Sequence, residues 1–247
     1  NRVLRLVQEL LDLSRIESGQ VSMQQDDVDL HELFEHVGEV FVEAGGIFFT
    51  GTKDSTIARN TVEDSSQFGI YGGQVRDTGA DAIRNNVIER NVVRDVNNAT
   101  SDGGGIKLYA RVTDGSTDNV IRHNWVDGVT HSMNRADGSF FAESDWSGSR
   151  WPQPIAAGIY LDWNSKGTQI IGNAVTDSWG GVLIVNGNDT LVKGNLIHGG
   201  YGTAFELVEH PQAGRPPLAG NLVTGNVIVR DDPRSAAEEL RGRVWAT

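Results

Sequence analysis

A short segment that ends in asparagine recurs along this chain and constrains its fold more than any other feature. The copies are IARN, IERN, IRHN, IIGN, VKGN and VTGN, and they end at Asn60, Asn91, Asn124, Asn173, Asn195 and Asn226. Their separations of 31, 33, 49, 22 and 31 residues are uneven, which excludes helical repeats of fixed period but suits stacked β-coils joined by loops of variable length. An amide stacked on an identical amide can donate to one neighbour and accept from the other, so we expect these side chains to form a ladder.

A second apolar strand follows most of these segments. Its copies are FGIYGG, GGIKLYA, AGIYLDW, GGVLIVN and TAFELVE. The closest spacings from the asparagine are nine and ten residues, which predicts one strand–turn–strand geometry repeated from coil to coil, with parallel strands about 4.8 Å apart. The sequence therefore predicts an all-β, parallel β-helix of about six coils over residues 44–230, preceded by an N-terminal α-helical segment over residues 1–43 and followed by a tail over residues 231–247.

The GGGI and GIYLD phrases, together with the asparagine repeat, resemble the right-handed parallel β-helix proteins of the pectate-lyase-like class. The resemblance covers about three quarters of the chain. It implies a right-handed solenoid and a carbohydrate-active function, as in β-helix glycoside hydrolases and polysaccharide lyases. It also implies that the aspartates of the DGGGI and YLD phrases, Asp102 and Asp162, form an acid/base pair.

Alternation along the second strand separates the inward side chains from the outward ones. Inward positions such as Ile106 and Leu108 are apolar or glycine in every copy, which sets the register. The outward side chains then include Lys107, Tyr109, Tyr160, Asp162 and Glu206. We expect these to share one solvent-facing wall, where carboxylates, an ammonium group and phenols form a groove for a carbohydrate.

Glycoside hydrolysis needs two carboxyl groups, one to donate a proton to the leaving oxygen and one to act as nucleophile or to activate water. Asp162 is the first candidate for one of them. Its partner is either Asp102, one coil earlier, or Glu206, two coils further along with a Cα separation of about 12 Å. Lys107 has a second interpretation as the base of a polysaccharide lyase. The structural alternative is that Asp102 caps a turn and that Asp162 forms a surface ion pair with Lys107, worth less than about 1 kcal/mol.

Residues 131–157 form an insertion that explains the longest separation between the asparagines. Long loops on a solenoid commonly bind ligands, and five of the six tryptophans lie between positions 125 and 179. Tryptophan rings offer flat apolar faces to sugar C–H groups, so we expect a glycan subsite near Asp162. The predicted substrate-binding residues are Tyr109, Tyr160, Trp163, His131, Arg150 and Trp151.

The first 40 residues have a different character. Apolar residues at helical spacing predict an amphipathic helix over residues 2–18. The phrases LVQELLDLSRIESGQ and VDLHELFEHV resemble the end of the dimerisation helices of bacterial sensor histidine kinases, which implies a possible dimer through this helix. The phosphoacceptor helix and the nucleotide-binding boxes of such kinases do not occur in the sequence, so kinase activity is not predicted. Alternatively, the segment caps one end of the solenoid.

Charge and composition restrict the partners. The formal net charge of −12 disfavours nucleic acid, because binding to a phosphate backbone needs a surplus of Lys and Arg. The sequence has no cysteine, no dense acidic cluster and no apolar window long enough to span a membrane. No metal or cofactor is therefore predicted, and Ca²⁺ is expected only in a lyase. The β-helix part suggests a secreted or periplasmic protein and the first segment a cytoplasmic origin, so the localisation stays open.

The leading functional hypothesis is a glycoside hydrolase that acts on a polysaccharide or oligosaccharide through paired carboxylates. It ranks ahead of a lyase because the net charge disfavours polyuronates and the outward face offers carboxylates. The alternatives are a polysaccharide lyase with Lys107 as base, a non-catalytic β-helix module for glycan binding or surface attachment, and a kinase-derived fusion fragment that acts only in dimerisation.

Overall fold

The computed structural model describes residues 45–73, 81–98, 100, 102–112, 114–130, 155–200, 202–209 and 217–229. The chain divides into two compact units, Asn1–Glu39 and Val40–Thr247. The helical segment predicted over residues 1–43 and the tail over residues 231–247 lie outside the described residues. None of the described residues belongs to a helix with the length and apolar character needed to cross a membrane.

The described part is all-β, and its strands form parallel sheets. In spatial order, the first sheet contains β1 (Ile47–Phe49), β4 (Phe68–Gly73), β8 (Asp102–Tyr109), β12 (Ile155–Asp162), β16 (Val182–Val185) and β19 (Phe205–Val208). The second contains β2 (Thr56–Ala58), β6 (Val87–Glu89), β10 (Val120–Arg122), β14 (Gln169–Ile171), β17 (Leu191–Lys193) and β20 (Leu222–Thr224). The third contains β3 (Thr61–Glu63), β7 (Val92–Arg94), β11 (Trp125–Asp127), β15 (Ala174–Thr176), β18 (Leu196–His198) and β21 (Val227–Val229). A smaller fourth sheet contains β5 (Ile83–Arg84), β9 (Ser116–Thr117) and β13 (Ser165–Lys166).

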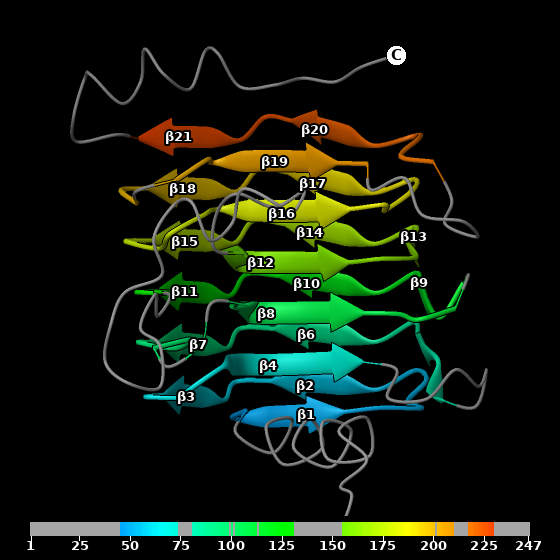
Figure 1. Ribbon diagram of the computed structural model, residues 1–247, viewed down its shortest axis with the longest axis horizontal. Coiled ribbons are helices and arrows are strands. Elements are labelled where there is room, and N and C mark those ends of the chain that lie inside the picture. Colours follow the sequence, from blue (N-terminus) through cyan, green and yellow to red (C-terminus); the bar gives the residue numbers. More distant parts are fainter. Residues whose placement is uncertain are drawn as a thin grey trace, which may run out of the picture. The chain divides into compact units, whose positions relative to one another are not determined.

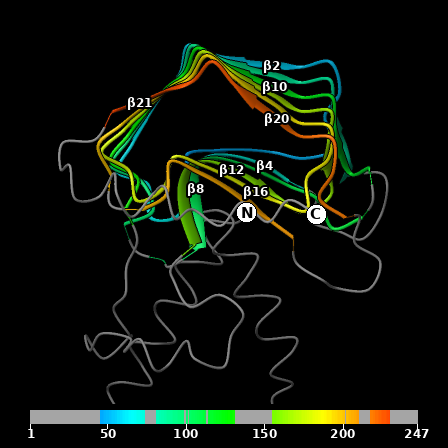
Figure 2. The same ribbon diagram turned by 90° about the horizontal axis from the view of Figure 1, so that it is seen from above.

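Successive strands belong to different sheets, and the chain returns to each sheet one strand further along. One such passage through the sheets is called a coil. From β4 in the first sheet the chain passes through β5, β6 and β7 in the fourth, second and third sheets, and then reaches β8 beside β4. Figure 1 shows the resulting layers of strands, and Figure 2 shows that strands of one sheet lie almost above one another. This arrangement of stacked parallel sheets is consistent with the predicted solenoid, and the six strands in each large sheet agree with the six predicted coils.

The interior is filled by aliphatic side chains that repeat from coil to coil. In the first sheet Ile70, Ile106 and Ile159 are paired in register and have no solvent exposure. The inward positions of the second and third sheets carry valine and isoleucine, such as Ile121 and Val126, which are equally buried. The alternation used to assign inward and outward side chains is therefore confirmed.

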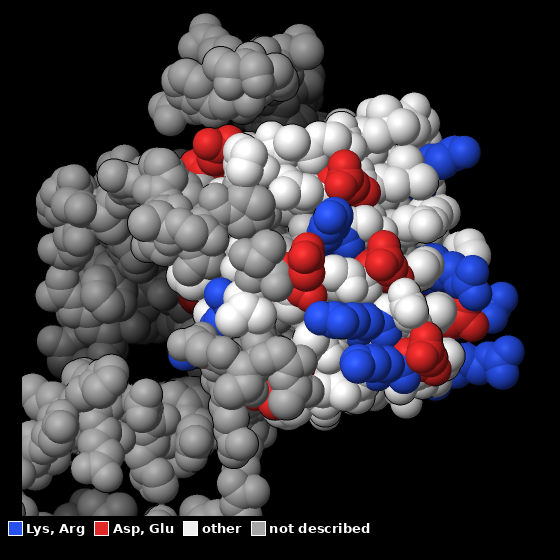
Figure 3. Space-filling model, turned by 90° about the vertical axis from the view of Figure 1, so that its right-hand side faces the viewer, with Lys and Arg blue, Asp and Glu red and all other residues white. Residues whose placement is uncertain are grey.

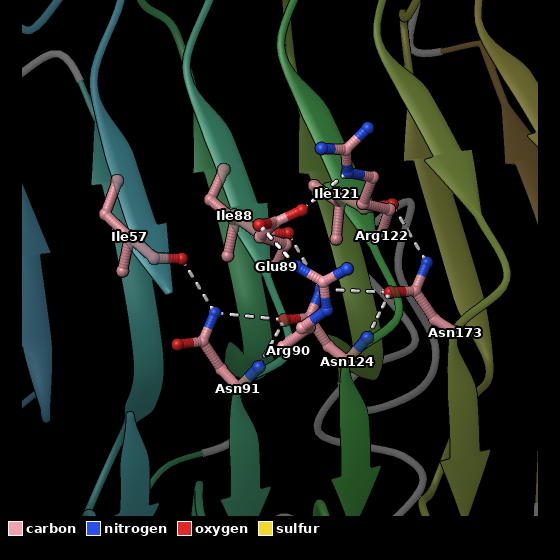
Figure 4. A network of polar contacts seen from close by, with 9 residues as sticks. All are labelled: Ile57, Ile88, Glu89, Arg90, Asn91, Ile121, Arg122, Asn124 and Asn173. Carbon is pink, nitrogen blue, oxygen red and sulfur yellow. Dashed lines mark hydrogen bonds and ion pairs between the residues drawn. The ribbon is translucent and has the colours of Figure 1, made fainter. Parts of the chain in front are cut away.

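The predicted asparagine ladder is also confirmed. Asn91 donates from Nδ2 to Oδ1 of Asn124 at 3.0 Å, and Asn124 donates in the same way to Asn173 at 2.9 Å (Figure 4). The second N–H of the Asn124 amide donates to the carbonyl of Ile88, one coil back. Each buried amide thus satisfies its own hydrogen bonds and links three coils, which explains the asparagine at every repeat.

A column of glycines lets the first sheet approach the third. The register of the flanking residues places Gly105 between Gly69 and Gly158. A Cβ at position 105 would lie 2.3 Å from Cγ1 of Val126 and 2.7 Å from the carbonyl oxygen of Gly158. Similar contacts surround Gly69 and Gly158. The glycines before Ile70, Ile106 and Ile159 are therefore required by packing, and they account for the glycine before isoleucine in the GGGI and GIYLD phrases.

We expect Gly105→Ala to lower the free energy of unfolding by about 1–3 kcal/mol or more, because the methyl group meets backbone as well as a side chain. Urea denaturation followed by circular dichroism measures the change. Gly194→Asn is the matched control, since a Cβ at position 194 meets nothing within 4 Å and asparagine tolerates its φ of +66°. Equal stability of Gly105→Ala and the wild type would contradict the close approach of the two sheets.

Candidate functional site

The outward side chains of the first sheet form the two columns predicted from strand alternation. One column runs through Tyr71, Lys107, Tyr160, Leu183 and Glu206, and the other through Gly73, Tyr109, Asp162, Val185 and Val208. Lys107 is thus directly beside Tyr160, and Tyr109 directly beside Asp162. The register of the site was predicted correctly.

The predicted exposure of this wall is wrong for its central residues. Lys107, Tyr160 and Asp162 retain only 4%, 2% and 7% of their accessible surface. One reason is that the outer face has an apolar cluster of its own, which consists of Ala157, Tyr160, Leu183 and Val185 with Ile155, Trp163 and Val208 packed against it. Strand alternation assigns a face but not the depth of cover over it.

Lys107 joins two carboxylates. Its Nζ lies 3.0 Å from Oδ1 of Asp102 and 3.0 Å from Oδ2 of Asp162. Since both oxygens contact the same nitrogen, they are at most about 6 Å apart, the range in which two carboxyl groups act on one substrate bond. The Asp162–Lys107 pair weighed in the sequence interpretation therefore exists, but it is buried, and the small energy of a surface pair does not apply to it.

Asp102 reaches this site because β8 is bent. It is the first residue of β8, opposite Ile155 of β12, and it precedes Lys107 by five positions. In a regular strand an odd separation would place the two side chains on opposite faces. Figure 2 shows β8 turning sharply near its start, where three glycines follow Asp102. This bend brings the Asp102 side chain, which is 55% exposed, over Lys107.

The three charged residues line a pocket of about 240 Å³. Its other lining residues are Tyr71, Tyr109, Ile155, Tyr160 and Trp163. The rings of Tyr109 and Trp163 are tilted at a centroid distance of 5.7 Å. Aromatic rings around a few convergent polar groups are typical of ligand pockets, and here they provide apolar faces beside two carboxylates.

Tyr71 and Phe68 extend the aromatic wall under Lys107. Their rings are stacked at 4.7 Å, and Nζ of Lys107 lies 5.3 Å from the Phe68 ring and 4.3 Å from the Tyr160 ring. A Cβ at Gly73 would lie 2.4 Å from the Tyr71 ring, so the missing side chain makes room for this phenol. The ammonium is therefore held between two carboxylates and two aromatic rings.

Burial and charge set the protonation of the site. Burial raises the pKa of Asp162, and the Lys107 ammonium opposes this rise without cancelling it. Burial alone would lower the pKa of Lys107, but Asp102 and Asp162 outweigh it and the net pKa is raised. Burial also raises the pKa of Tyr71 and Tyr160. The site thus holds a cationic lysine, neutral phenols and one carboxyl group that retains its proton to higher pH than an ordinary aspartate.

Glu206, the rival partner of Asp162, lies elsewhere. It is exposed on β19, with β16 between it and β12, and it does not line the pocket. Two strand spacings and an offset of two residues separate the Cα atoms of Glu206 and Asp162 by about 12 Å, whereas Asp102 and Asp162 contact the same nitrogen. The structure therefore brings Asp102, and not Glu206, to Asp162.

Several predicted binding residues can be placed and others cannot. Tyr109, Tyr160 and Trp163 line the pocket, whereas His131, Arg150 and Trp151 lie outside the described residues. Trp125 lies on β11 of the third sheet, away from the pocket, so the expected gathering of tryptophans near Asp162 is wrong for this residue.

Sequence reasoning missed two pocket residues. Tyr71 is not among the predicted site residues, although its place beside Lys107 in the outward column was a usable signal. Ile155 was assigned to the insertion, whereas β12 begins there and pairs with Asp102. The isoleucine and two alanines before GIYLD, opposite DGG, were the signal for that longer strand.

No group of three or more His, Asp or Glu side chains suited to a metal ion occurs among the described residues. Comparisons of the chain with protein-family models, with curated proteins and with solved structures found no match. What the site does therefore has to be argued from its own chemistry.

Proposed function

We propose that this protein is a glycoside hydrolase built on a right-handed parallel β-helix of the pectate-lyase-like kind, with the pocket on the first sheet as its active site. The observation that carries the proposal is the pair of carboxylates in contrasting surroundings. Asp162 is buried with a raised pKa, and Asp102 is more than half exposed, while both contact one ammonium group. Two carboxyl groups in unlike environments are what separate acid and base roles require.

Asp162 suits the role of general acid. Its raised pKa favours the protonated form needed to donate to a leaving oxygen, and Tyr160 and Lys107 hold it in place. Asp102, accessible at the pocket wall, suits the attack on the sugar. Retaining glycosidases keep their carboxyl groups about 5–5.5 Å apart and inverting enzymes about 6.5–9.5 Å. A separation of at most about 6 Å between the nearest oxygens favours retention, with Asp102 as nucleophile.

A lyase is less compatible with this arrangement. Its base must accept a proton, but the two carboxylates raise the pKa of Lys107 and keep the ammonium charged. The aromatic rings of Phe68 and Tyr160 further enclose the nitrogen. Lys107 is better suited to orient Asp102 and Asp162 than to abstract a proton.

Incubation with a panel of neutral and uronic polysaccharides tests the reaction type. We expect new reducing ends without the ultraviolet absorbance of unsaturated products, and the first product, observed by NMR, should retain the anomeric configuration of the substrate. Absorbance from unsaturated ends would replace this proposal with elimination. Retention of a polysaccharide on the protein without any turnover would instead favour the non-catalytic glycan-binding module.

A further inference from the structure

The described residues that line the pocket include one cationic group and two carboxyl groups. The cation is Lys107, and the carboxyl groups belong to Asp102 and Asp162. The phenols of Tyr71 and Tyr160 stay neutral, because burial raises their pKa. Among the described lining residues, Lys107 is therefore the one group that could pair with a negatively charged substituent on a sugar.

The ammonium group of Lys107 already contacts both carboxyl groups of the pocket. An ammonium group has three N–H donors, and two of them serve Asp102 and Asp162 at 3.0 Å. The nitrogen also lies 4.3 Å from the Tyr160 ring centroid, and the side chain is only 5% exposed. A sugar carboxylate in the pocket would have to displace one of these aspartates to reach the ammonium, which would leave that aspartate without its partner.

Asp102 acts against an anion directly. The Asp102 side chain is 55% exposed to solvent, whereas the side chains of Lys107 and Asp162 are almost fully covered. An incoming anion therefore meets a like charge before it meets the cation. On the side of the molecule drawn in Figure 3, which is not the pocket face, acidic and basic side chains of the described residues are interspersed.

We propose that the pocket binds uncharged sugars and rejects uronic acids, and that Asp102 is a determinant of this selectivity. The inference rests on the proposed function, since it assumes that the ligand of the pocket is a sugar. It specifies the substrate class as neutral glycans. It also gives Asp102 a second role, because the same carboxylate that attacks a neutral sugar repels a charged one.

Pairs of methyl glycosides test this selectivity without any need for turnover. The probes are the methyl glycosides of glucose, galactose and mannose and the corresponding methyl uronides, which differ only by a carboxylate in place of the C6 hydroxymethyl group. Dissociation constants are measured by NMR titration at pH 7. We expect the best neutral sugar to bind at least about tenfold more tightly than its uronide, because the uronide carboxylate would lie a few ångströms from the negative charge of Asp102.

The Asp102→Asn variant should reduce this ratio by at least about threefold, because the amide removes the repelling charge and still accepts a hydrogen bond from Lys107. Asp118→Asn is the matched control. It removes the same charge from an exposed position with a φ of +54°, which asparagine tolerates, and should leave the ratio unchanged.

The outcomes separate the two proposals. Uronides that bind as tightly as neutral sugars would overturn the selectivity and leave the hydrolase proposal intact. An equal ratio in wild type and Asp102→Asn, or an equal change in Asp118→Asn, would overturn the role of Asp102. If no member of either set binds, the selectivity proposal is overturned, and the polysaccharide assay decides the hydrolase proposal separately.

Discussion

Asp162→Asn should lower kcat on any glycan that the wild type cleaves by about 10²- to 10⁴-fold, the contribution expected of a general acid. The amide keeps the size of the side chain and still accepts a hydrogen bond from Lys107, but it has no acidic proton to deliver. Substrates with good leaving groups, such as nitrophenyl glycosides, should lose much less activity, because they depart without protonation. Steady-state kinetics on both substrate types measures the difference.

Glu206→Gln is the control for this experiment. Glu206 belongs to the same sheet face as Asp162 but lies outside the pocket, so its variant should retain wild-type kcat and KM. Full activity of Asp162→Asn on natural glycans would remove Asp162 from the mechanism. A loss in Glu206→Gln as large as that in Asp162→Asn would show that the wrong carboxylate has been paired with Asp162.

Lys107→Met should lower the free energy of unfolding by about 3–5 kcal/mol at pH 7, because it leaves the buried Asp162 carboxylate without its counter-charge. Asp162 binds its proton more tightly in the folded than in the unfolded protein, so the stability of the fold decreases as the pH rises from the ordinary aspartate range through the raised pKa. Loss of the ammonium raises that pKa further. The destabilisation should therefore be smaller at pH 4 than at pH 7, as urea titrations at the two pH values can measure.

Lys166→Met provides the comparison, since Lys166 is exposed on β13 and its removal should change stability by no more than about 0.5 kcal/mol. If Lys107→Met were as stable as Lys166→Met at pH 7, the ion pairs of Lys107 would not hold the site together. A destabilisation that did not depend on pH would assign the loss to packing of the side chain and not to its charge.

Strand alternation was sufficient to predict the framework of this site. The inward positions had to be apolar, and only one register of the repeats satisfied Ile70, Ile106 and Ile159 together. Once that register was set, Lys107 and Asp162 had to lie on the outer face of neighbouring coils. The asparagine ladder followed from the same reasoning, because a buried amide needs a partner in each direction.

Burial and bending could not be predicted in the same way. The burial of Lys107 depends on how aromatic rings of the neighbouring strands, including those of Phe68 and Tyr160, pack against it, and strand alternation does not specify this packing. The position of Asp102 depends on a bend at three glycines, which breaks the alternation that the prediction used. Glycine at a strand start indicates that a bend is possible but does not specify its direction.

The pH dependence of kcat/KM tests the central claim most directly, namely that Asp162 is a general acid whose proton is governed by burial and by Lys107. Activity of the wild type should fall on the alkaline side as the pH passes the raised pKa of Asp162. In folded Lys107→Met this fall should move to higher pH, because the charge that lowers the pKa of Asp162 is gone, whereas Lys166→Met should match the wild type. An alkaline limb at the same pH in wild type and Lys107→Met would contradict the account.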